Sequence, residues 1–184
     1  MLLVVVGCSD QKTGSSSTSG SNESTKPAHA GRAPSDIRVE PGTIERKPRP
    51  WVLTTPESAV RSYLDWSSYA YRIGQSEVAY PTMSTYEQVR VDSYVQYNLE
   101  KFQLIDQKLE SITFGKASVT GSGAVLPAKE KWTYRYVSIK TAGKTLSGPH
   151  SANYDVTYTL IKNPKATSSW VVDSVRAKAV GEVQ

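Results

Sequence analysis

The sequence contains a single cysteine, Cys8, and only two histidines, His29 and His150. One cysteine cannot form a disulfide within the chain, which excludes the disulfide frameworks of small secreted domains. The same inventory is too small for a zinc centre of several Cys and His ligands, and it leaves no Cys-His catalytic pair. The glycines lie in a Ser-rich segment and in turns, so no phosphate-binding loop is present. We therefore predict no metal site, no cofactor site and no catalytic residue of these types.

Aromatic residues are missing from the first fifty positions. All four Trp, all eleven Tyr and both Phe lie between residues 51 and 184. Large aromatic side chains contribute much of the core in a domain of this size, so we expect one globular domain over 51–184. A domain of about 134 residues buries roughly two-thirds of the surface that its unfolded chain exposes. It can therefore be stable without a metal or a disulfide.

No concentrated positive charge accounts for the net charge of +5. Residues 1–50 hold seven Lys or Arg and five Asp or Glu, and residues 51–184 hold fifteen and twelve. The densest basic cluster, residues 46–49, lies in a Pro-rich segment and is not interleaved with aromatic residues. Nucleic-acid sites usually combine clustered basic residues with a recognisable motif. We therefore expect a mildly basic solvated surface and no nucleic-acid partner.

Long hydrophobic runs are also absent, and the longest apolar stretch is the short segment 1–8. It cannot cross a bilayer, because a spanning helix needs about 20 apolar residues. Its last four residues, Val5-Val6-Gly7-Cys8, resemble the lipobox of bacterial lipoproteins. The resemblance implies export, attachment of a diacylglyceryl group to the Cys8 thiol, cleavage before Cys8, and acyl chains such as palmitate in the membrane. It places the protein at the extracytoplasmic face of a cell membrane.

A complete signal peptide has a basic start and a longer apolar stretch than residues 1–8 provide. We therefore expect the codons upstream of Met1 to encode Lys or Arg and further apolar residues. After Cys8, residues 13–25 are small and polar apart from Glu23, and residues 26–50 are rich in Pro. Neither composition can bury enough apolar surface to offset the entropy of ordering. The segment 9–50 is predicted to be a disordered tether.

Helix signals dominate the first half of the domain. Thr55 is a cap residue, Pro56 suits the first helical position and Gly74 suits a helix end, which predicts a helix over 56–73. A short second helix is expected around residues 77–80, ended by Pro81. Ser84 begins a capping box. After it, one apolar face predicts a long third helix to about Gln107, formed by Val91, Tyr94, Val95, Asn98, Phe102, Ile105 and Leu109.

Strand patterns follow Leu109. We predict strands over 112–119, with a bulge at Gly115, and over 128–137, with Trp132, Tyr134 and Tyr136 on the same face as Ala128. Two further strands are predicted over 154–160 and from Trp170 to Ala179, with Gly and Pro turn signals between them. Helices followed by strands indicate an α+β domain. We expect N-terminal helices packed on a curved antiparallel four-strand sheet.

Between residues 54 and 180 the domain resembles the nuclear transport factor two-like superfamily. The resemblance rests on Thr55-Pro56-Glu57-Ser58-Ala59-Val60, on the long third helix and on the closing segment Trp170-Val171-Val172-Asp173-Ser174-Val175. It implies a bent sheet that folds around the helices as a cone. In this superfamily the cone can be a ligand pocket, and some members use an Asp, His or Tyr on its wall for acid-base chemistry. A cystatin-like sheet is the alternative fold.

The ionisable candidates for such a wall are Asp65, Asp155, Asp173 and His150, and no motif places any of them. Asp65 is expected on a solvated helix face or bonded to a neighbouring Tyr. His150 is expected in a surface turn, and Asp155 on the solvent face of its strand.

The most abundant candidate for a binding surface is tyrosine, which recurs at binding surfaces but also fills half-buried sheet faces. The eleven are Tyr63, Tyr69, Tyr71, Tyr80, Tyr86, Tyr94, Tyr97, Tyr134, Tyr136, Tyr154 and Tyr158.

These features predict a non-enzymatic envelope lipoprotein whose domain binds a small ligand or an envelope protein partner. The alternative is an enzyme of the isomerase, dehydratase or hydrolase type that works in the cone. A carboxylate or imidazole inside an apolar pocket would keep the enzyme alternative open, because burial can tune its pKa. A cone filled by Trp132, Tyr134 and Tyr158, without a buried ionisable group, would exclude it.

Overall fold

The computed structural model describes residues 47–141 and 143–181. Within them, helices come first and an antiparallel sheet follows, so the predicted α+β class is confirmed. Cys8, the lipobox and most of the predicted tether 9–50 lie outside the described residues. The elements are α1 (Pro56–Ile73), the 3-10 helix η1 (Ser76–Thr82), α2 (Thr85–Glu100), β1 (Gln103–Phe114), β2 (Ser118–Thr120), β3 (Gly123–Ser138), β4 (Thr145–Asn163) and β5 (Ala166–Ala179).

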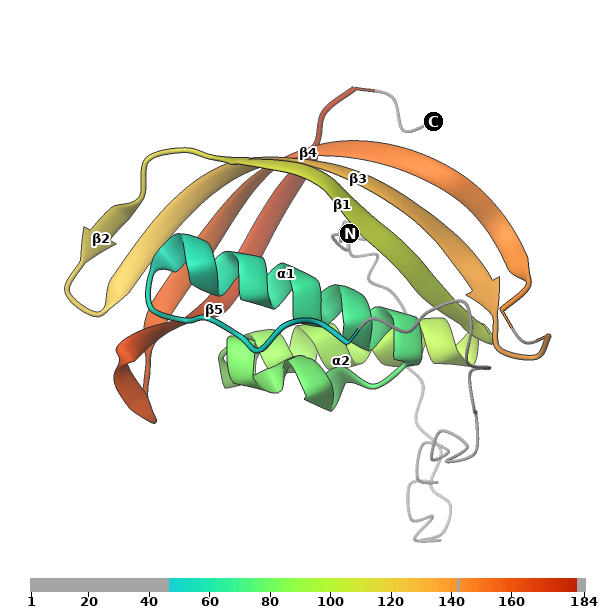
Figure 1. Ribbon diagram of the computed structural model, residues 1–184, viewed down its shortest axis with the longest axis horizontal. Helices are drawn as coiled ribbons and strands as arrows, with labels where there is room; N and C mark the ends of the chain where they lie inside the picture. The colour runs from blue at the N-terminus through green and yellow to red at the C-terminus, as the bar shows by residue number, and fades with distance from the viewer. Residues whose placement is uncertain (1–46, 142, 182–184) are drawn as a thin grey trace, which may run out of the picture.

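The sheet is antiparallel throughout and has the strand order β1-β3-β4-β5, with β2 paired to β3. Figure 1 shows it as an arch, with α1 under the concave face and α2 farther from the sheet. Four strands were expected, and the first of them is divided here into β1 and the three-residue β2. The helices cover the concave face of this arch. The space between these layers contains both the core and the candidate site.

Local signals set the limits of α1. The Thr55 hydroxyl accepts a hydrogen bond from the backbone N–H of Ser58 at 3.2 Å, and the Ser58 hydroxyl accepts one from the N–H of Thr55 at 3.0 Å. This reciprocal pair closes the N-terminal end of the helix. At the other end Gly74 adopts a left-handed conformation with φ of 69°. The helix predicted over 56–73 is therefore confirmed at both ends.

The predicted continuation of the third helix to Gln107 is wrong. α2 ends at Glu100, Phe102 has a positive φ of 54°, and β1 begins at Gln103. From there β1 pairs with β3, beginning with Gln103 opposite Ser138. The apolar residues after Glu100 fit a helical spacing, but the ladder of long-range hydrogen bonds to β3 determines their structure.

Other strand and turn details also differ from the sequence prediction. The expected strand over 112–119 is two strands, β1 and β2, and the register shift in β1 lies between Leu109 and Ser111 instead of at Gly115. Pro81 lies inside η1 instead of ending a helix before it. Near the end of β3, register shifts relative to β4 interrupt the alternation, so that Val137 is buried although it was placed opposite the Trp132 face.

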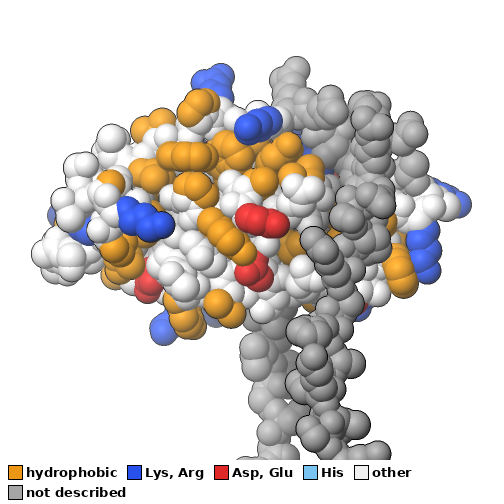
Figure 2. All heavy atoms as spheres, turned by 90° about the horizontal axis from the view of Figure 1, so that it is seen from below, with side chains coloured by type: hydrophobic (Ala, Val, Ile, Leu, Met, Phe, Trp, Pro, Cys, Tyr) orange, Lys and Arg blue, Asp and Glu red, His pale blue; other side chains and the backbone are white. Residues whose placement is uncertain are grey.

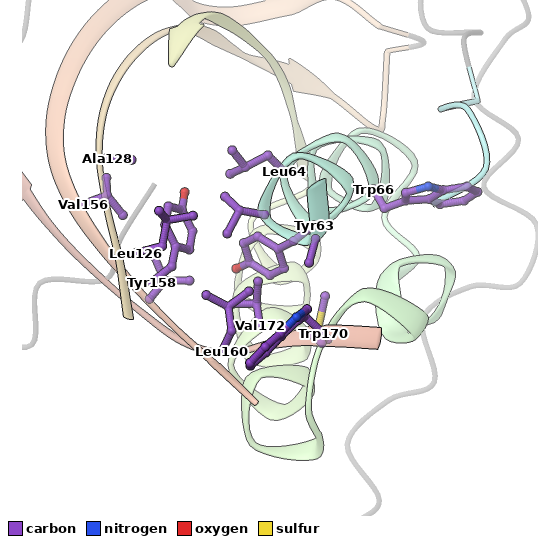
Figure 3. Close-up of a cluster of buried hydrophobic side chains, with 14 of the residues drawn as sticks. Tyr63, Leu64, Trp66, Leu126, Ala128, Val156, Tyr158, Leu160, Trp170 and Val172 are labelled. Atoms are coloured by element: carbon purple, nitrogen blue, oxygen red, sulfur yellow. The ribbon is translucent and has the colours of Figure 1, made fainter. Parts of the chain in front are cut away.

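The hydrophobic core lies between α1 and the β3-β4-β5 part of the sheet. Figure 3 shows Tyr63 of α1 pointing toward Leu126, Tyr158 and Leu160, all of which are almost fully buried. Trp66 points away from this cluster, and its ring meets that of Trp51 edge to face at 5.5 Å. The core therefore anchors α1 to the sheet and fixes the distance at which the two layers face each other.

Candidate functional site

A cavity of about 310 Å³ lies between the two α-helices and the concave face of the sheet. This volume falls at the lower end of the range for small-molecule sites. Its wall is mostly apolar and aromatic, with a few polar groups. The lining residues are Tyr63, Leu64, Ser67, Tyr71, Glu87, Val89, Arg90, Val91, Ser93, Tyr94, Gln107, Glu130, Trp132, Tyr154, Val156, Tyr158, Val175 and Ala177.

Glu130 is a buried carboxylate in the wall formed by β3. Ala128, Glu130 and Trp132 alternate with exposed neighbours and are all buried, so their side chains share the concave face. The Trp132 indole donates a hydrogen bond to Oε2 of Glu130 at 2.7 Å, and the Tyr158 hydroxyl donates one to Oε1. Each oxygen can accept further hydrogen bonds. Glu130 is thus an oriented acceptor inside an apolar cavity.

Glu87 is the second buried carboxylate and comes from the first turn of α2. Its Oε1 accepts a hydrogen bond from the Tyr63 hydroxyl at 2.8 Å, and its Oε2 lies 3.1 Å from the Arg90 guanidinium. Arg90 also donates to the Val175 carbonyl at 3.1 Å. Burial raises the pKa of Glu87, against the opposing effects of the Tyr63 hydrogen bond and the Arg90 charge. This carboxylate is therefore held by α1, α2 and β5 together.

The two tyrosines that contact these glutamates serve as hydrogen-bond donors. Burial raises the pKa of both Tyr63 and Tyr158 well above the usual tyrosine value of 10.0. Their hydroxyls therefore remain protonated at neutral pH. The two rings meet edge to face at 6.3 Å, so the Tyr63–Glu87 and Tyr158–Glu130 pairs are neighbours across the space between α1 and the sheet.

Ser67 of α1 supplies a polar group without a partner. It is buried and lines the cavity, yet its hydroxyl has no hydrogen-bond partner within the described part of the chain. The adjacent Ser68 differs, because its hydroxyl accepts a hydrogen bond from the Gln107 side chain at 2.9 Å. A buried unsatisfied hydroxyl is unfavourable. At Ser67 it leaves one hydrogen-bonding group facing the cavity that a ligand could use.

The cavity reaches the surface beside α2. Val89 and Ser93 line it and are both exposed, and the Arg90 side chain is about one-third exposed. Figure 2 shows the molecule from the helix side, where hydrophobic side chains gather and acidic side chains lie among them. A small molecule could therefore enter from this side without disrupting the sheet.

None of the four ionisable residues singled out from the sequence lines this cavity. Asp65 is exposed on α1, and Asp155 is exposed on β4, 4.0 Å from the Lys129 ammonium. The surface turn expected for His150 is wrong, because this residue lies half-buried in β4 opposite Tyr134, hydrogen-bonded to Ser147 at 2.7 Å. Asp173 is partly buried on β5, where its charge contributes to the raised pKa of Glu87. The solvent positions expected for Asp65 and Asp155 are confirmed.

The sequence reasoning missed Glu87 and Glu130 as cavity residues. Glu130 stands between Ala128 and Trp132 in the alternating pattern, which already places a carboxylate on the inward face. Glu87 was assigned to a capping box, but only half of that motif forms. The Ser84 hydroxyl accepts from the Glu87 N–H, whereas the N–H of Ser84 donates to the Val172 carbonyl. This leaves the Glu87 side chain free to turn inward to Tyr63.

The described residues contain no group of three or more His, Cys, Asp or Glu side chains arranged to hold a metal ion. Nor is any helix of the described ranges long and apolar enough to cross a membrane.

Five of the eleven tyrosines line the cavity: Tyr63, Tyr71, Tyr94, Tyr154 and Tyr158. The arrangement is that of an aromatic cavity with two carboxylates.

No family model and no curated protein matches this sequence. Solved structures do match its fold. The intermembrane space region of the chloroplast protein ARC6 aligns with a TM-score of 0.58 and 14% identity, over 72% of this chain and 100% of that one. This similarity supports the α+β fold and no more.

Two other solved structures match less well. A nuclear transport factor 2-like superfamily protein from Salmonella enterica aligns with a TM-score of 0.46 and 14% identity, over 67% of this chain and 89% of that one. A periplasmic fragment of TraM aligns with a TM-score of 0.47 and 10% identity, over 67% of this chain and 95% of that one. Membership of the nuclear transport factor two-like superfamily stays a prediction.

Proposed function

We propose that this protein is a lipid-anchored extracytoplasmic binding protein, whose cavity between the helices and the sheet holds a small organic ligand without transforming it. The observation that carries the proposal is the cavity itself. Its wall is largely aromatic and apolar, and Glu130, Glu87 and Ser67 supply a few oriented polar groups. Sites of this composition are typical of small-molecule binding.

The anchor is proposed from the sequence. Val5-Val6-Gly7-Cys8 resembles a lipobox, and the polar segment 9–50 would separate the domain from the bilayer. At least two acyl chains are needed for stable attachment, and a lipoprotein cysteine carries that number. The ARC6 region that shares the fold is described as lying in an intermembrane space, which is compatible with an extracytoplasmic position.

The binding proposal can be tested by ligand-observed NMR with a fragment library and the full chain carrying Cys8→Ser. We expect a subset of fragments to bind the otherwise unaltered chain and to lose binding when Ser67→Leu fills part of the cavity. Thr157→Leu is the matched control, because Thr157 is exposed on the opposite face of β4. Fragments that bind all three proteins equally would show that the cavity is not the binding site.

The anchor proposal has its own test. Cells that produce the full precursor are labelled with a fatty-acid analogue, and the label is followed in the purified protein. We expect label on the unaltered protein and none on Cys8→Ser, which should also leave the detergent phase during phase partitioning. A protein that takes up no label but still fractionates with membranes would contradict lipid attachment at Cys8.

An enzyme is the second candidate function, and one observation favours it. Two buried carboxylates, Glu87 and Glu130, lie in the cavity beside protonated tyrosines, and burial raises the pKa of Glu87. Such groups can transfer protons. Once a ligand is identified, prolonged incubation with catalytic amounts of protein decides between the functions. Turnover that disappears in Glu130→Gln would favour an enzyme, and an unchanged ligand would favour binding.

A further inference from the structure

The two buried glutamates of the cavity differ in their electrostatic partners. Glu87 lies 3.1 Å from the Arg90 guanidinium and forms an ion pair with it. Glu130, which is 6% exposed, accepts hydrogen bonds from two neutral donors, the Trp132 indole and the Tyr158 hydroxyl. Among the residues that the structure describes, no Lys, Arg or His nitrogen lies within 4.0 Å of its carboxylate. Buried carboxylates are normally paired with a cation.

The walls around Glu130 suit a positive charge attached to an apolar body. The aromatic rings of Trp132, Tyr63, Tyr158 and Tyr154 all line the same cavity. The face of an aromatic ring attracts a cation, most strongly where water is excluded. The same rings provide apolar contact area for a hydrocarbon group. A ligand with both features can therefore use the carboxylate and the rings at once.

Ser67 provides an observation that is independent of Glu130. Its hydroxyl is buried, lines the cavity and has no hydrogen-bond partner within the described ranges. A hydroxyl oxygen accepts hydrogen bonds from N–H groups. The N–H groups of an ammonium ion could therefore satisfy Ser67 and Glu130 from opposite walls, since Ser67 comes from α1 and Glu130 from β3.

We propose that the cavity selects a small organic ammonium ion, with its charged nitrogen at Glu130 and its hydrocarbon body against the surrounding aromatic rings. This inference rests on the proposed ligand-binding function and specifies the chemical class of the ligand. A bare metal ion fits less well, because no group of three ligands is present in the described part of the chain. An anion would be repelled by Glu130. Among the described residues, Arg90 supplies the only guanidinium of the cavity wall, and it is already paired with Glu87.

The test compares cyclohexylamine with cyclohexanol, which have the same ring and differ in charge at neutral pH. Both are titrated into the full chain carrying Cys8→Ser, and the indole N–H resonance of Trp132 is followed by heteronuclear NMR. That group donates to Glu130, so a ligand at the carboxylate must perturb it. We expect cyclohexylamine to bind at least about tenfold more tightly than cyclohexanol, a difference of about 1.4 kcal/mol.

Three variants locate the source of the preference. Glu130→Gln keeps the side-chain shape and should abolish the preference for the amine while leaving cyclohexanol binding unchanged. Glu110→Gln removes the same charge from an exposed side chain outside the cavity and should have no effect. Ser67→Ala should weaken the binding of cyclohexylamine a few-fold. This variant keeps the proposal testable if circular dichroism shows that Glu130→Gln does not fold.

Equal affinities for the two compounds would overturn the inference but leave the ligand-binding function intact, since the cavity would bind without selecting charge. Equal losses of affinity for cyclohexylamine in Glu130→Gln and Glu110→Gln would also overturn the inference, because the effect would not originate in the cavity. If neither compound perturbs Trp132, the inference is overturned and the ligand-binding function loses its support as well.

Discussion

At the residue scale, neighbouring serines on α1 show how the same side chain can have opposite effects on stability. The Ser68 hydroxyl accepts a hydrogen bond from Gln107, whereas the Ser67 hydroxyl is buried at the cavity without a partner. A satisfied buried hydrogen bond contributes about 1 kcal/mol, and an unsatisfied hydroxyl costs about 1–3 kcal/mol. Ser67 therefore lowers the stability of the ligand-free domain, as is common for groups retained for function.

We predict that Ser67→Ala raises the free energy of unfolding by about 1 kcal/mol, because it removes an unsatisfied hydroxyl. Ser68→Ala should lower it by about 1 kcal/mol, because the Gln107 amide then loses its acceptor. Urea denaturation followed by tryptophan fluorescence measures both. A loss of stability in Ser67→Ala equal to that in Ser68→Ala would show that Ser67 has a partner in the folded protein.

The buried tyrosines predict how stability depends on alkaline pH. Burial raises the pKa of Tyr63 and Tyr158 well above 10.0, the value that applies in the unfolded chain. Below pH 10 both states keep these protons, and above it only the unfolded state releases them. The free energy of unfolding should therefore fall as the pH rises above 10, by about 1.4 kcal/mol per pH unit for each such tyrosine.

Urea denaturation at a series of alkaline pH values, together with tyrosinate absorbance, tests this expectation. If all tyrosines titrate near pH 10 while the domain stays folded, the burial of Tyr63 and Tyr158 is wrong.

At the element scale, the sequence predicted structure well where local chemistry decides it. Thr55, Pro56 and Gly74 set the ends of α1, and each acts through its own backbone or the nearest turn. The predicted end of α2 was wrong because Phe102, Ile105 and Leu109 also fit a helical spacing. Phe102 lies between α2 and β1 and is not part of the ladder that β1 forms with β3. Ile105 pairs with Tyr136 and Leu109 with Trp132, both far along the chain in β3. No local signal carries that information.

Gly74 provides an element-scale prediction. Its φ is +69°, and a Cβ added there would lie 3.0 Å from side-chain atoms of both Leu99 and Leu104. Left-handed backbone costs a residue with a Cβ about 1–2 kcal/mol, so Gly74→Ala should destabilise by at least about 2 kcal/mol once crowding is added. Gly121→Ala is the control, because its φ is +56° but, apart from its chain neighbours, no described residue has an atom within 4 Å of the added Cβ.

Thermal and urea unfolding of the two variants separates backbone strain from crowding. We expect a clearly larger loss of stability for Gly74→Ala than for Gly121→Ala. Equal losses would mean that Leu99 and Leu104 move aside freely, and that the junction of α1 with β1 is loosely packed.

For the candidate site, the sequence indicated the aromatic residues that line the cavity but not the carboxylates that face it. The tyrosines were considered either for a binding surface or for half-buried packing, and five of them do line the cavity. Glu87 was missed because it fits a capping motif, and Glu130 was missed although it alternates inward with Ala128 and Trp132. The alternation indicates the face on which Glu130 lies, but whether that face borders a cavity depends on how the sheet bends over the helices.

At the scale of the whole molecule, the described structure begins before the predicted domain boundary at residue 51. The Trp66 indole donates a hydrogen bond to the Arg49 carbonyl at 3.1 Å, and the Lys47 ammonium lies 5.8 Å from the centre of the Trp66 ring. These contacts attach residues 47–50 to α1. The predicted boundary therefore divides residues that are in contact.

We predict that a chain of residues 47–184 unfolds at the same temperature as the full chain carrying Cys8→Ser. A chain of residues 51–184 should be less stable by about 1 kcal/mol, because the buried Trp66 indole loses its acceptor. Calorimetry of the three proteins measures the difference. Identical melting of the two shorter chains would show that residues 47–50 contribute nothing to the fold.

A crystal structure of the protein purified from the envelope of its own organism, without refolding, would show directly whether the cavity beneath the sheet is a ligand site. We predict electron density for a small organic molecule in contact with Trp132 and Tyr158, with a nitrogen within hydrogen-bonding distance of Glu130. A cavity that has collapsed, so that these side chains pack against one another and leave no space, would contradict the claim.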